Sequence, residues 1–450
     1  MYLAYSLLLS LGLLVLIPHF LYQALAHGKY LEGLRQRLGS LPQIPAQRPL
    51  IWLHCVSVGE TQAARPLVQR LKREFPNHSL VVSTITRTGQ TLASEVFAQQ
   101  ADSVFYFPFD WRWCVRRALR AINPSVVLLM ETELWPNFLR ECTAREIPVA
   151  LVNGRISRQS FRRYAWIKFF LKRVLESLSI AVMQSEADAS RLQDLGMRAD
   201  AIRTAGNLKF DAGALPPAGE KTAEIRNRFG LHAGTPLILA ASTHPPEEKI
   251  LLESFRLLSA SQTVRLMLAP RHPERFAEVA SLIENAGLSW TRRTNTPEAA
   301  DTQASVILLD TIGELPAAYA LATVVFVGGS IVDRGGHNVL EPAAAGAPVV
   351  TGAHTHNFHA IVSLLEQADA IVQLPPLDAS AASAELARVL NDLLAKPERR
   401  AELAARAKQL VATNQGATER TVRIITPLLS TQRRDSSQSN SVLATNAQTS

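Results

Sequence analysis

A carboxylate that could act as a general base follows the first apolar run of the chain. Glu60 ends the segment Ser57-Val58-Gly59-Glu60, which comes directly after residues 50–56 and opens a helical pattern. A glutamate within hydrogen-bond reach of an attacking hydroxyl can accept its proton, and the glycine before it lets a bound group approach the backbone closely. A simpler role is also open, because a carboxylate at a helix start stabilises the helix dipole.

Two further acids follow the apolar run at residues 125–130. Residues 131–137 read ETELWPN, with Glu131 directly at the end of the run and Glu133 two positions later. Thr132 or Glu133 could cap the next helix, which would explain one of these residues but not both acids. We therefore expect at least one of the two acids to serve chemistry.

Lys209 lies in residues 206–211 (GNLKFD), at the beginning of a segment rich in Gly, Pro and Ala. At a junction between two domains its ammonium could meet an anionic ligand, as lysines do at phosphate sites. The alternative is an ordinary solvated lysine, and position alone does not decide between the two.

Glycine, arginine and histidine gather after apolar runs in the second half of the chain. Residues 270–273 (PRHP) and 328–330 (GGS) end two such runs, and residues 335–338 (GGHN) precede the helical pattern NVLEPAAA. Glycines before a helix expose backbone N–H groups to an anion. One glycine pair is a weak signal, but three such elements together indicate a site for a nucleotide phosphate. Glu341, one turn into the pattern, could accept hydrogen bonds from ribose hydroxyls or simply favour the helix N-terminus.

Several patterns of metal and nucleotide chemistry do not occur in the sequence. There is no D-x-D, no H-E-x-x-H and no paired Cys/His spacing, and Cys55, Cys114 and Cys142 are widely separated. These facts argue against structural zinc and a disulfide framework and indicate a reducing compartment. The P-loop motif and a G-x-G-x-x-G after a first strand are also missing, which argues against a P-loop ATPase and a dinucleotide oxidoreductase. We expect no metal and no cofactor.

The elements that must position these residues are short apolar runs that alternate with helical patterns. Each run is β-branched and continuously apolar, as a strand covered on both faces should be. The pattern predicts two doubly wound α/β domains with parallel sheets that face each other across a cleft, with ligands beyond the carboxyl ends of the strands. The predicted strands are residues 50–56, 79–84, 125–130, 148–152 and 179–183, and then 236–240, 264–268, 305–309, 323–327 and 348–350.

The composition fits a large folded protein with an acidic partner. The 450 residues are 47% hydrophobic and 19% charged, which excludes bulk disorder, and the formal net charge is +8. This length suits about three domains, or two large ones with additional segments. The positive balance does not choose between nucleic acid, anionic lipid and a phosphorylated substrate.

The N-terminus predicts a membrane anchor. No Asp, Glu, Lys or Arg occurs before Lys29, and residues 2–26 are long enough to cross a bilayer core of about 30 Å. The excess of Lys and Arg that follows places the body of the protein in the cytoplasm. A cleavable signal peptide ending in Ala24-Leu25-Ala26 and a buried helix are the alternatives, but no basic residue precedes the apolar run as in a signal peptide.

Residues 155–173 form a second segment that suits a membrane surface. They contain seven basic residues, five aromatic residues and no acid. Aromatic rings lie at the level of lipid headgroups, and cations meet their phosphates. The alternative is a buried helix whose arginines extend to solvent, and the charges are interleaved around the helix rather than gathered on one face. Nucleic acid is disfavoured as a partner because the N-terminus predicts an anchor.

Taken together, the motifs resemble one family, the 3-deoxy-D-manno-octulosonic acid (Kdo) transferases of lipopolysaccharide synthesis. The resemblance runs from the N-terminal anchor to about residue 425 and leaves only the polar tail outside it. The matching motifs, in order, are SVGE at 57–60, ETELWPN at 131–137, NGRIS at 153–157, GNLKFD at 206–211, PRHPER at 270–275 and GGHNVLEPAA at 335–344.

The resemblance implies a GT-B fold and a metal-independent, inverting transfer of Kdo from CMP-Kdo to the lipid A precursor, lipid IVA. It implies that Glu60 is the proton acceptor and that Glu131 and Lys209 stabilise the transition state. The residues that it assigns to CMP are Pro270, Arg271, Ile312, Gly313, Glu314, Asn338, Val339, Leu340 and Glu341.

The expected organisation follows from the motifs and the composition. It comprises a membrane anchor at 1–28, an acceptor-binding Rossmann-like domain at 29–205, a linker at 206–222, a CMP-Kdo-binding Rossmann-like domain at 223–429 and a disordered polar tail at 430–450. The expected location is the cytoplasmic side of the inner membrane.

Two other functions stay open on the sequence. One is a different GT-B enzyme, such as a hexosaminyl transferase or an epimerase, which would share the glycine-rich phosphate site but use another nucleotide. The other is a membrane-anchored binding protein without catalysis, which the joint presence of Glu60, Glu131 and Lys209 argues against. A Glu60→Gln variant separates the second possibility from an enzyme.

Overall fold

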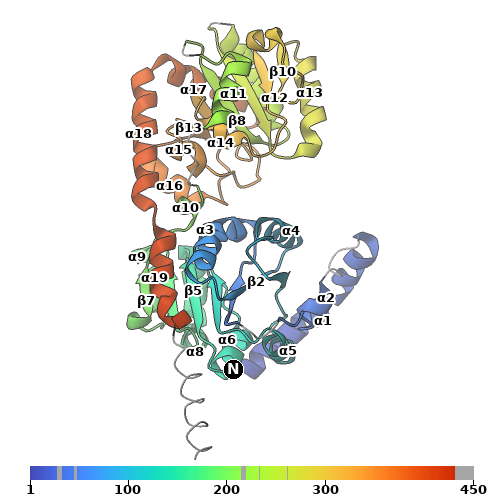
Figure 1. Cartoon of the computed structure of the whole chain (residues 1–450), viewed down its shortest axis with the longest axis vertical. Coiled ribbons are helices and arrows are strands. Elements are labelled where there is room, and N and C mark those ends of the chain that lie inside the picture. Colours follow the sequence, from blue (N-terminus) through green and yellow to red (C-terminus); the bar gives the residue numbers. More distant parts are fainter. Residues whose placement is uncertain (28–32, 45–47, 214–218, 233, 261, 431–450) are drawn as a thin grey trace, which may run out of the picture. The chain divides into compact units, whose positions relative to one another are not determined.

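Two compact units make up the chain, each built on a parallel sheet (Figure 1). The computed structural model describes residues 1–27, 33–44, 48–213, 219–232, 234–260 and 262–430. The first unit consists of Met1–Ala212 and Gln415–Ser450, and the second of Gly213–Asn414. The predicted fold class of two doubly wound α/β domains is confirmed.

In the described residues, the first unit holds a seven-stranded sheet with the strand order β3-β2-β1-β4-β5-β6-β7. Every pairing in it is parallel. Its strands are β1 (Leu50–His54), β2 (Ser79–Thr84), β3 (Ser103–Tyr106), β4 (Val126–Met130), β5 (Val149–Gly154), β6 (Ile180–Met183) and β7 (Ile202–Thr204). Its helices are α1 (Tyr2–His27), α2 (Leu34–Arg37), α3 (Val58–Glu74), α4 (Arg87–Val96), α5 (Arg112–Ile122), α6 (Pro136–Thr143), α7 (Arg158–Trp166), α8 (Lys168–Leu175), α9 (Glu186–Asp194), α10 (Lys209–Ala212) and α19 (Ala417–Ser430).

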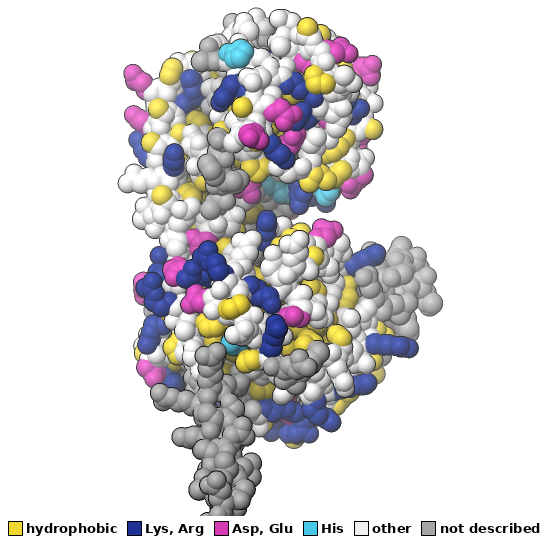
Figure 2. Space-filling model, in the orientation of Figure 1, with side chains coloured by type: hydrophobic (Ala, Val, Ile, Leu, Met, Phe, Trp, Pro, Cys, Tyr) yellow, Lys and Arg dark blue, Asp and Glu magenta, His cyan; other side chains and the backbone are white. Residues whose placement is uncertain are grey.

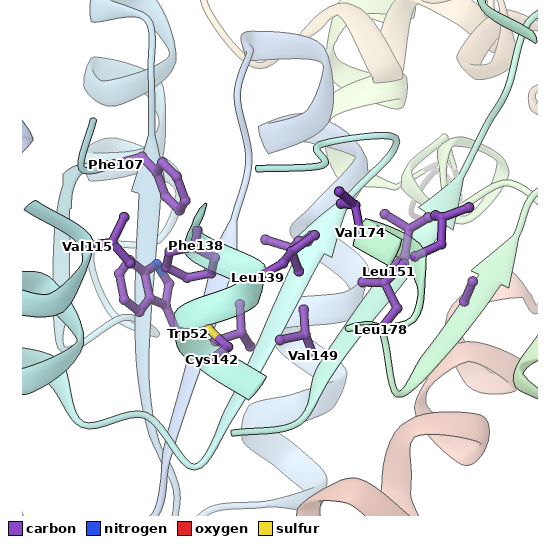
Figure 3. Close-up of a cluster of buried hydrophobic side chains, with 14 of the residues drawn as sticks. Trp52, Phe107, Val115, Phe138, Leu139, Cys142, Val149, Leu151, Val174 and Leu178 are labelled. Carbon is purple, nitrogen blue, oxygen red and sulfur yellow. The ribbon is translucent and has the colours of Figure 1, made fainter. Parts of the chain in front are cut away.

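Both faces of this sheet are buried, as the continuous apolar runs predict. Successive residues of β1 belong to different clusters, with Trp52 on one face and Ile51 and Leu53 on the other. The Trp52 ring meets Phe138 edge to face at a centroid distance of 5.2 Å (Figure 3). Its indole N–H donates to Ser83 Oγ over 2.8 Å, so the polar atom of this buried ring is also satisfied.

The second unit repeats the plan, with the strand order β10-β11-β9-β8-β12-β13-β14 in the described residues and parallel pairing throughout. Its strands are β8 (Leu237–Thr243), β9 (Arg265–Pro270), β10 (Trp290–Arg292), β11 (Val306–Leu308), β12 (Val324–Val327), β13 (Val349–Thr351) and β14 (Val372–Gln373). Its helices are α11 (Glu220–Phe229), α12 (Glu247–Ser259), α13 (Phe276–Asn285), α14 (Leu315–Tyr319), α15 (Leu340–Ala344), α16 (His359–Gln367), α17 (Ala379–Ala395) and α18 (Pro397–Asn414).

The expected C-terminal domain, residues 223–429, extends too far, because α19 packs on the first unit. Its apolar side chains Val422 and Ile425 lie in the core on one face of the first sheet. The Asp211 carboxylate accepts hydrogen bonds from the backbone N–H groups of Gly416 and Thr418, over 2.7 and 2.6 Å. The C-terminal helix therefore completes the first unit. The predicted polar tail lies outside the described residues from 431 onward.

Helix α1 lies against the first unit through polar and aromatic contacts. The Trp111 indole N–H donates to Ser10 Oγ over 3.1 Å, and the Asn137 amide donates to Ser6 Oγ over 3.0 Å. Phe170 of α8 packs against the rings of Tyr2 and Tyr5. Among the described residues, no helix combines the length and apolar character needed to cross a membrane. The predicted anchor at 1–28 therefore stays a prediction.

Candidate active site

The candidate base Glu60 is held at the carboxyl end of β1. Ser57 caps α3, and Glu60 lies in the first turn of that helix with its side chain turned back toward the strand. The backbone N–H of Val56 donates to Glu60 Oε2 over 2.8 Å, and the Ser57 hydroxyl donates to Oε1 over 3.0 Å. Only 6% of the residue is exposed. Glu60 thus lies at a helix start, as the sequence predicts, and its carboxyl group has a fixed orientation.

The surroundings of Glu60 change its acidity. Burial is the largest cause and the neighbouring Glu131 carboxylate the next, and together they raise the pKa of Glu60 to about 8. The hydrogen bond from Val56 opposes this rise. A carboxyl group with this pKa changes protonation state close to neutral pH, which is the range in which general bases work well.

A lysine and a glutamate from distant parts of the chain meet beside this carboxyl group. Glu131 follows β4 with a positive φ of 53°, and Lys209 is the first residue of α10. The Lys209 Nζ atom lies 3.9 Å from Glu131 Oε1, with 16% and 26% of the two side chains exposed. The structure thus brings together the three predicted residues of the first unit, since Glu131 also acts on the pKa of Glu60. Lys209 is largely buried, so the solvated-lysine alternative is wrong.

Asn153 positions the segment that carries Lys209. This residue lies near the end of β5 with a positive φ of 54°, and it is 1% exposed. Its Oδ1 atom accepts the backbone N–H of Leu208 over 3.0 Å, and Asn207 Oδ1 accepts that of Lys209 over 3.0 Å. The asparagine of the NGRIS motif had no predicted role. Its role depends on a contact across the fold that spacing in the sequence does not reveal.

Glu133 is a third carboxyl group of this region. Burial raises its pKa to about 7, and the charge of Glu131 adds to the rise. The capping role considered for Thr132 or Glu133 is wrong, because α6 begins later, at Pro136. The first N–H groups of α6 are instead capped by the carboxylate of Asp110, over 3.0 and 2.7 Å.

In the second unit, two of the residues assigned to CMP lie at the end of β9. Pro270 is the last residue of the strand, and Arg271 follows it with an exposed side chain. The Arg271 backbone N–H donates to the carbonyl of Thr243 over 3.1 Å, which fixes the arginine beside the neighbouring strand β8. An exposed guanidinium at the carboxyl edge of a parallel sheet can bind a phosphate through paired N–H donors.

The segment Asn338–Glu341 presents one carboxylate and buries two apolar side chains. The Asn338 amide donates to Glu341 Oε1 over 3.0 Å, and the buried Tyr319 hydroxyl also hydrogen-bonds Glu341. Val339 and Leu340 are 1% and 0% exposed, so neither presents its side chain to a ligand. Glu341 is thus oriented by two neighbours, as a group that recognises ribose hydroxyls requires.

The segment Ile312–Glu314 is anchored at one end and open at the other. Burial alone would raise the pKa of Glu314, but its hydrogen bonds with Arg293 and Thr311 lower it below the usual value. The Arg293 pair has an N–O distance of 2.9 Å. Ile312 is 80% exposed, and Gly313 has a φ of 82°. The turn therefore presents Ile312 and a glycine backbone outward from a fixed carboxylate.

The glycines that end β12 do not present their amides to a phosphate, which corrects one expectation. The backbone N–H groups of Gly329, Ser330 and Ile331 donate to the carboxylate of Glu247, over 2.7, 2.9 and 2.9 Å. Glu247 is fully buried and also accepts the N–H of His244 over 3.0 Å. An internal carboxylate occupies the position that the sequence suggested for a ligand. No pattern of period or spacing marks Glu247 for this role.

Across the residues that the structure describes, no group of three or more His, Cys, Asp or Glu side chains is arranged to hold a metal ion.

Comparison with known proteins identifies the family. A family model described as 3-deoxy-D-manno-octulosonic-acid transferase (kdotransferase) matches residues 32–212. The 3-deoxy-D-manno-octulosonic acid transferase of Haemophilus influenzae is 34% identical over 89% of this chain and 92% of its own length. This chain belongs to the Kdo transferase family. The Kdo transferase of Bordetella pertussis is 36% identical over 86% of this chain and 89% of its own.

Solved structures with low sequence identity share the fold. A glycosyltransferase from Rickettsia africae matches with a TM-score of 0.54 at 14% identity, over 85% of this chain and 99% of that one. A putative UDP-N-acetylglucosamine 2-epimerase from Listeria monocytogenes matches with a TM-score of 0.52 at 14% identity, over 83% of this chain and 95% of that one. These likenesses show the two-domain GT-B-like architecture and nothing about substrates.

Proposed function

We propose that this Kdo transferase moves Kdo from CMP-Kdo to the lipid A precursor, lipid IVA, by a metal-independent displacement that inverts the anomeric centre. Glu60 accepts the proton of the acceptor hydroxyl while that oxygen forms a bond to the anomeric carbon of Kdo. The bond from this carbon to the phosphate oxygen breaks, and CMP leaves. A single displacement by the incoming hydroxyl gives inversion.

The observation that carries the proposal is the environment of Glu60. Its carboxyl group is buried and oriented by two hydrogen bonds, and its pKa of about 8 comes from burial and from Glu131. The Lys209 ammonium near Glu131 supplies a positive charge where the transition state gathers negative charge. A base of this kind is what an enzyme requires and a binding protein does not.

The donor end of the proposal rests on the second unit. Arg271 and the segments 312–314 and 338–341 come from different strand ends of one parallel sheet, the edge at which such sheets bind nucleotides. Glu341 supports ribose recognition, and the cationic Arg271 supports binding of the phosphate of CMP.

We further propose that the protein acts at the cytoplasmic surface of the inner membrane, with α1 lying against the bilayer. In α1, the residues turned toward the unit are Tyr2, Tyr5, Ser6, Leu9, Ser10 and Leu13. Between them the leucines Leu3, Leu7 and Leu11 are exposed at 82%, 62% and 51%. The half-buried and exposed residues recur with the period of a helix that has one exposed apolar face.

Neighbouring helices supply the charges for an anionic lipid surface. Residues 158–175 form two helices rather than one, and the described side chains of α7 include no buried residue. Trp166 and Phe169 are 92% and 74% exposed beside the basic residues of the same segment. Figure 2 shows Lys and Arg side chains gathered at the lower end of this unit. Rings and cations together support an interfacial site.

The proposed reaction is tested by mass spectrometry of the product. The purified protein is incubated in detergent with lipid IVA and with CMP-Kdo generated in the same tube, with a chelator present. A gain of one or more Kdo masses supports donor, acceptor and metal independence together. Product that requires an added divalent ion overturns metal independence, and transfer from a UDP-sugar instead of CMP-Kdo overturns the donor assignment.

Flotation with lipid vesicles tests the proposed membrane surface. Wild type is expected to float with vesicles that contain anionic lipid, and a Leu7→Gln, Leu11→Gln variant is expected to stay with the soluble fraction. Equal flotation of both proteins would contradict a role for this face of α1.

A further inference from the structure

The strand ends of the second unit bring together three histidines from three separate loops. His244 follows β8, His272 follows β9 and His337 lies in the loop after β12. The Nε2 atoms of His244 and His337 are 2.8 Å apart, and the two ring planes are within 8° of each other. The His272 ring meets the His244 ring edge to face, with centroids 5.1 Å apart. His272 and His337 lie in the segments 270–273 and 335–338 that the sequence predicts to hold a nucleotide phosphate, and His244 had no predicted role.

The 2.8 Å contact joins His244 and His337 into one proton-binding group. Two imidazole nitrogens at this distance share a single proton, because one must donate and the other accept. In the neutral pair, a second proton lies on the outer Nδ1 atom of one ring, and the outer Nδ1 of the other ring is bare. Within the described part of the chain, neither Nδ1 atom has a hydrogen-bond partner. The pair can therefore take up one more proton without losing its central hydrogen bond.

A buried carboxylate fixes the two loops that carry the His244–His337 pair. Glu247 accepts the backbone N–H groups of both His244 and Gly329, and so joins the loop after β8 to the loop after β12. A side chain at Gly329 would meet the His337 ring, since a Cβ atom there would lie 2.9 Å from its Cδ2. The short distance between the two imidazoles is thus set by backbone that has little freedom to move.

Charges around the pair favour an anion. Burial is the main cause that lowers the pKa of His337 to about 3 and of His244 to about 4, and nearby cations lower both further. The unliganded pair is therefore neutral at physiological pH. The charged and titratable groups that act on it are Arg271, His272, Arg275, Arg334 and Glu248, of which Glu248 is itself paired with Arg275 over 2.6 Å. An anion bound among these groups would offset the repulsion that keeps the extra proton away.

We propose that the His244–His337 pair binds the phosphate of the donor nucleotide, and that it takes up one proton when the nucleotide binds. The proposal rests on the proposed function, since it takes CMP as the ligand beside Arg271. It adds two donor-binding residues and a link between pH and donor affinity. Protonation gives the pair a positive charge and an N–H donor on both outer Nδ1 atoms. These atoms lie at opposite ends of the pair, so one of them bonds a phosphate oxygen and the added charge strengthens the attraction for the anion.

Calorimetric titration of the full-length protein with CMP tests this. Proton uptake is measured from the apparent enthalpy in two buffers of different ionisation enthalpy at pH 6.5 and 7.5. Uptake of one proton makes CMP binding about tenfold tighter for each unit by which the pH is lowered. The phosphate of CMP titrates near pH 6 itself, so the quantity that decides is the difference between wild type and a variant.

The deciding variant is His244→Gln, whose amide can bond His337 but does not titrate in this range. His232→Gln, an exposed histidine of the same unit, is the matched control. We expect His232→Gln to keep the wild-type proton uptake and His244→Gln to lose it, with a CMP affinity about threefold or more weaker at pH 6.5. A melting curve checks that each variant is folded.

Three results would overturn the proposal. If wild type binds CMP with no proton uptake beyond that of the phosphate of CMP itself, the role of the pair is overturned and the proposed function is left intact. The role of the pair is also overturned if folded His244→Gln takes up as many protons on CMP binding as wild type does. No binding of CMP by wild type in either buffer overturns the donor assignment of the proposed function, and the role of the pair with it.

Discussion

The Nζ atom of Lys209 lies 3.9 Å from Oε1 of Glu131, although the two residues come from α10 and from the loop after β4. The lysine is held there by backbone hydrogen bonds to Asn153 and Asn207. The same Glu131 carboxylate raises the pKa of Glu60. One acid thus links a cation to the candidate base, and the account of the reaction depends on this arrangement.

The first prediction concerns the coupling of these two charges. Glu131→Gln and Lys209→Met are each expected to lower kcat by about 100-fold or more, because each removes a charge that acts on the transition state. The double variant is expected to lose less than the product of the two losses, with a coupling of about 0.5–3 kcal/mol. Rates of Kdo transfer for the four proteins give this value. Strictly additive losses would show that the two residues act separately.

The second prediction concerns the pH profile of catalysis. Glu60 must be ionised to accept a proton, and its pKa is about 8, so kcat/KM for the lipid acceptor at saturating CMP-Kdo is expected to rise with pH between 6.5 and 8.5. Because Glu131 contributes to the raised pKa, Glu131→Gln should shift this rise to lower pH. Glu95→Gln, an exposed acid on α4, is the control and should leave the profile in place. A profile that Glu131→Gln does not move would contradict the link between the two acids.

The third prediction concerns stability. A carboxyl group has a pKa of about 4.3 in the unfolded chain, and that of Glu60 is raised to about 8 in the folded protein. The folded state then binds the proton more tightly, so the stability due to this group is fully present below pH 4 and is lost as pH rises to about 8. Glu60→Gln carries no such proton. Its melting temperature should therefore exceed that of wild type by a margin that grows from pH 5 to pH 8.

Calorimetry with Glu95→Gln as the control separates this effect from a general change of net charge. A margin for Glu60→Gln that is constant with pH, or that shrinks as pH rises, would mean that Glu60 has an ordinary pKa in the folded protein.

The fourth prediction concerns the donor site. Arg271→Gln is expected to weaken CMP binding by about tenfold or more, because a charge-assisted bond to phosphate contributes about 1.5–3 kcal/mol. Arg226→Gln, an exposed arginine on α11, is the matched control. Equal CMP affinities for the two variants, measured by calorimetric titration, would remove Arg271 from the donor site.

The interior of each sheet could be predicted from the sequence, and the edges could not. Every apolar run predicted as a strand overlaps a strand in the structure. The strands that were missed are β3, β7, β10 and β14, which form the two edges of the two sheets. Edge strands are short and only partly buried here, as in Ile202–Thr204 and Val372–Gln373. They lack the continuous apolar character of strands covered on both faces.

The residues of the candidate site could likewise be predicted only in part from the sequence. The rule that ligands bind beyond strand ends was enough to select Glu60, Glu131 and Arg271, since each follows a strand or precedes a helix in the sequence. This rule could not predict contacts between segments that are distant in the sequence. The bond from Asn153 to the segment before Lys209 depends on the packing of the whole unit. The pairing of His244 with His337 does so as well.

The C-terminal helix shows the limit most clearly. Residues 417–430 follow the second unit in sequence, and their composition resembles that of its helices. The hydrogen bonds from Gly416 and Thr418 to Asp211, and the burial of Val422 and Ile425, reveal that the helix belongs to the first unit. The order of the segments along the chain predicted a domain boundary that the packing of this helix on the first unit contradicts.

The central claim is that Glu60 is the base of Kdo transfer. It is tested most directly by measuring transfer from CMP-Kdo to lipid IVA for wild type, Glu60→Gln and Glu95→Gln at pH 8, with CMP affinity measured on the same samples. The account predicts that Glu60→Gln binds CMP as wild type does but transfers Kdo about 100- to 10,000-fold more slowly, while Glu95→Gln transfers normally. Transfer by Glu60→Gln at the wild-type rate would contradict it.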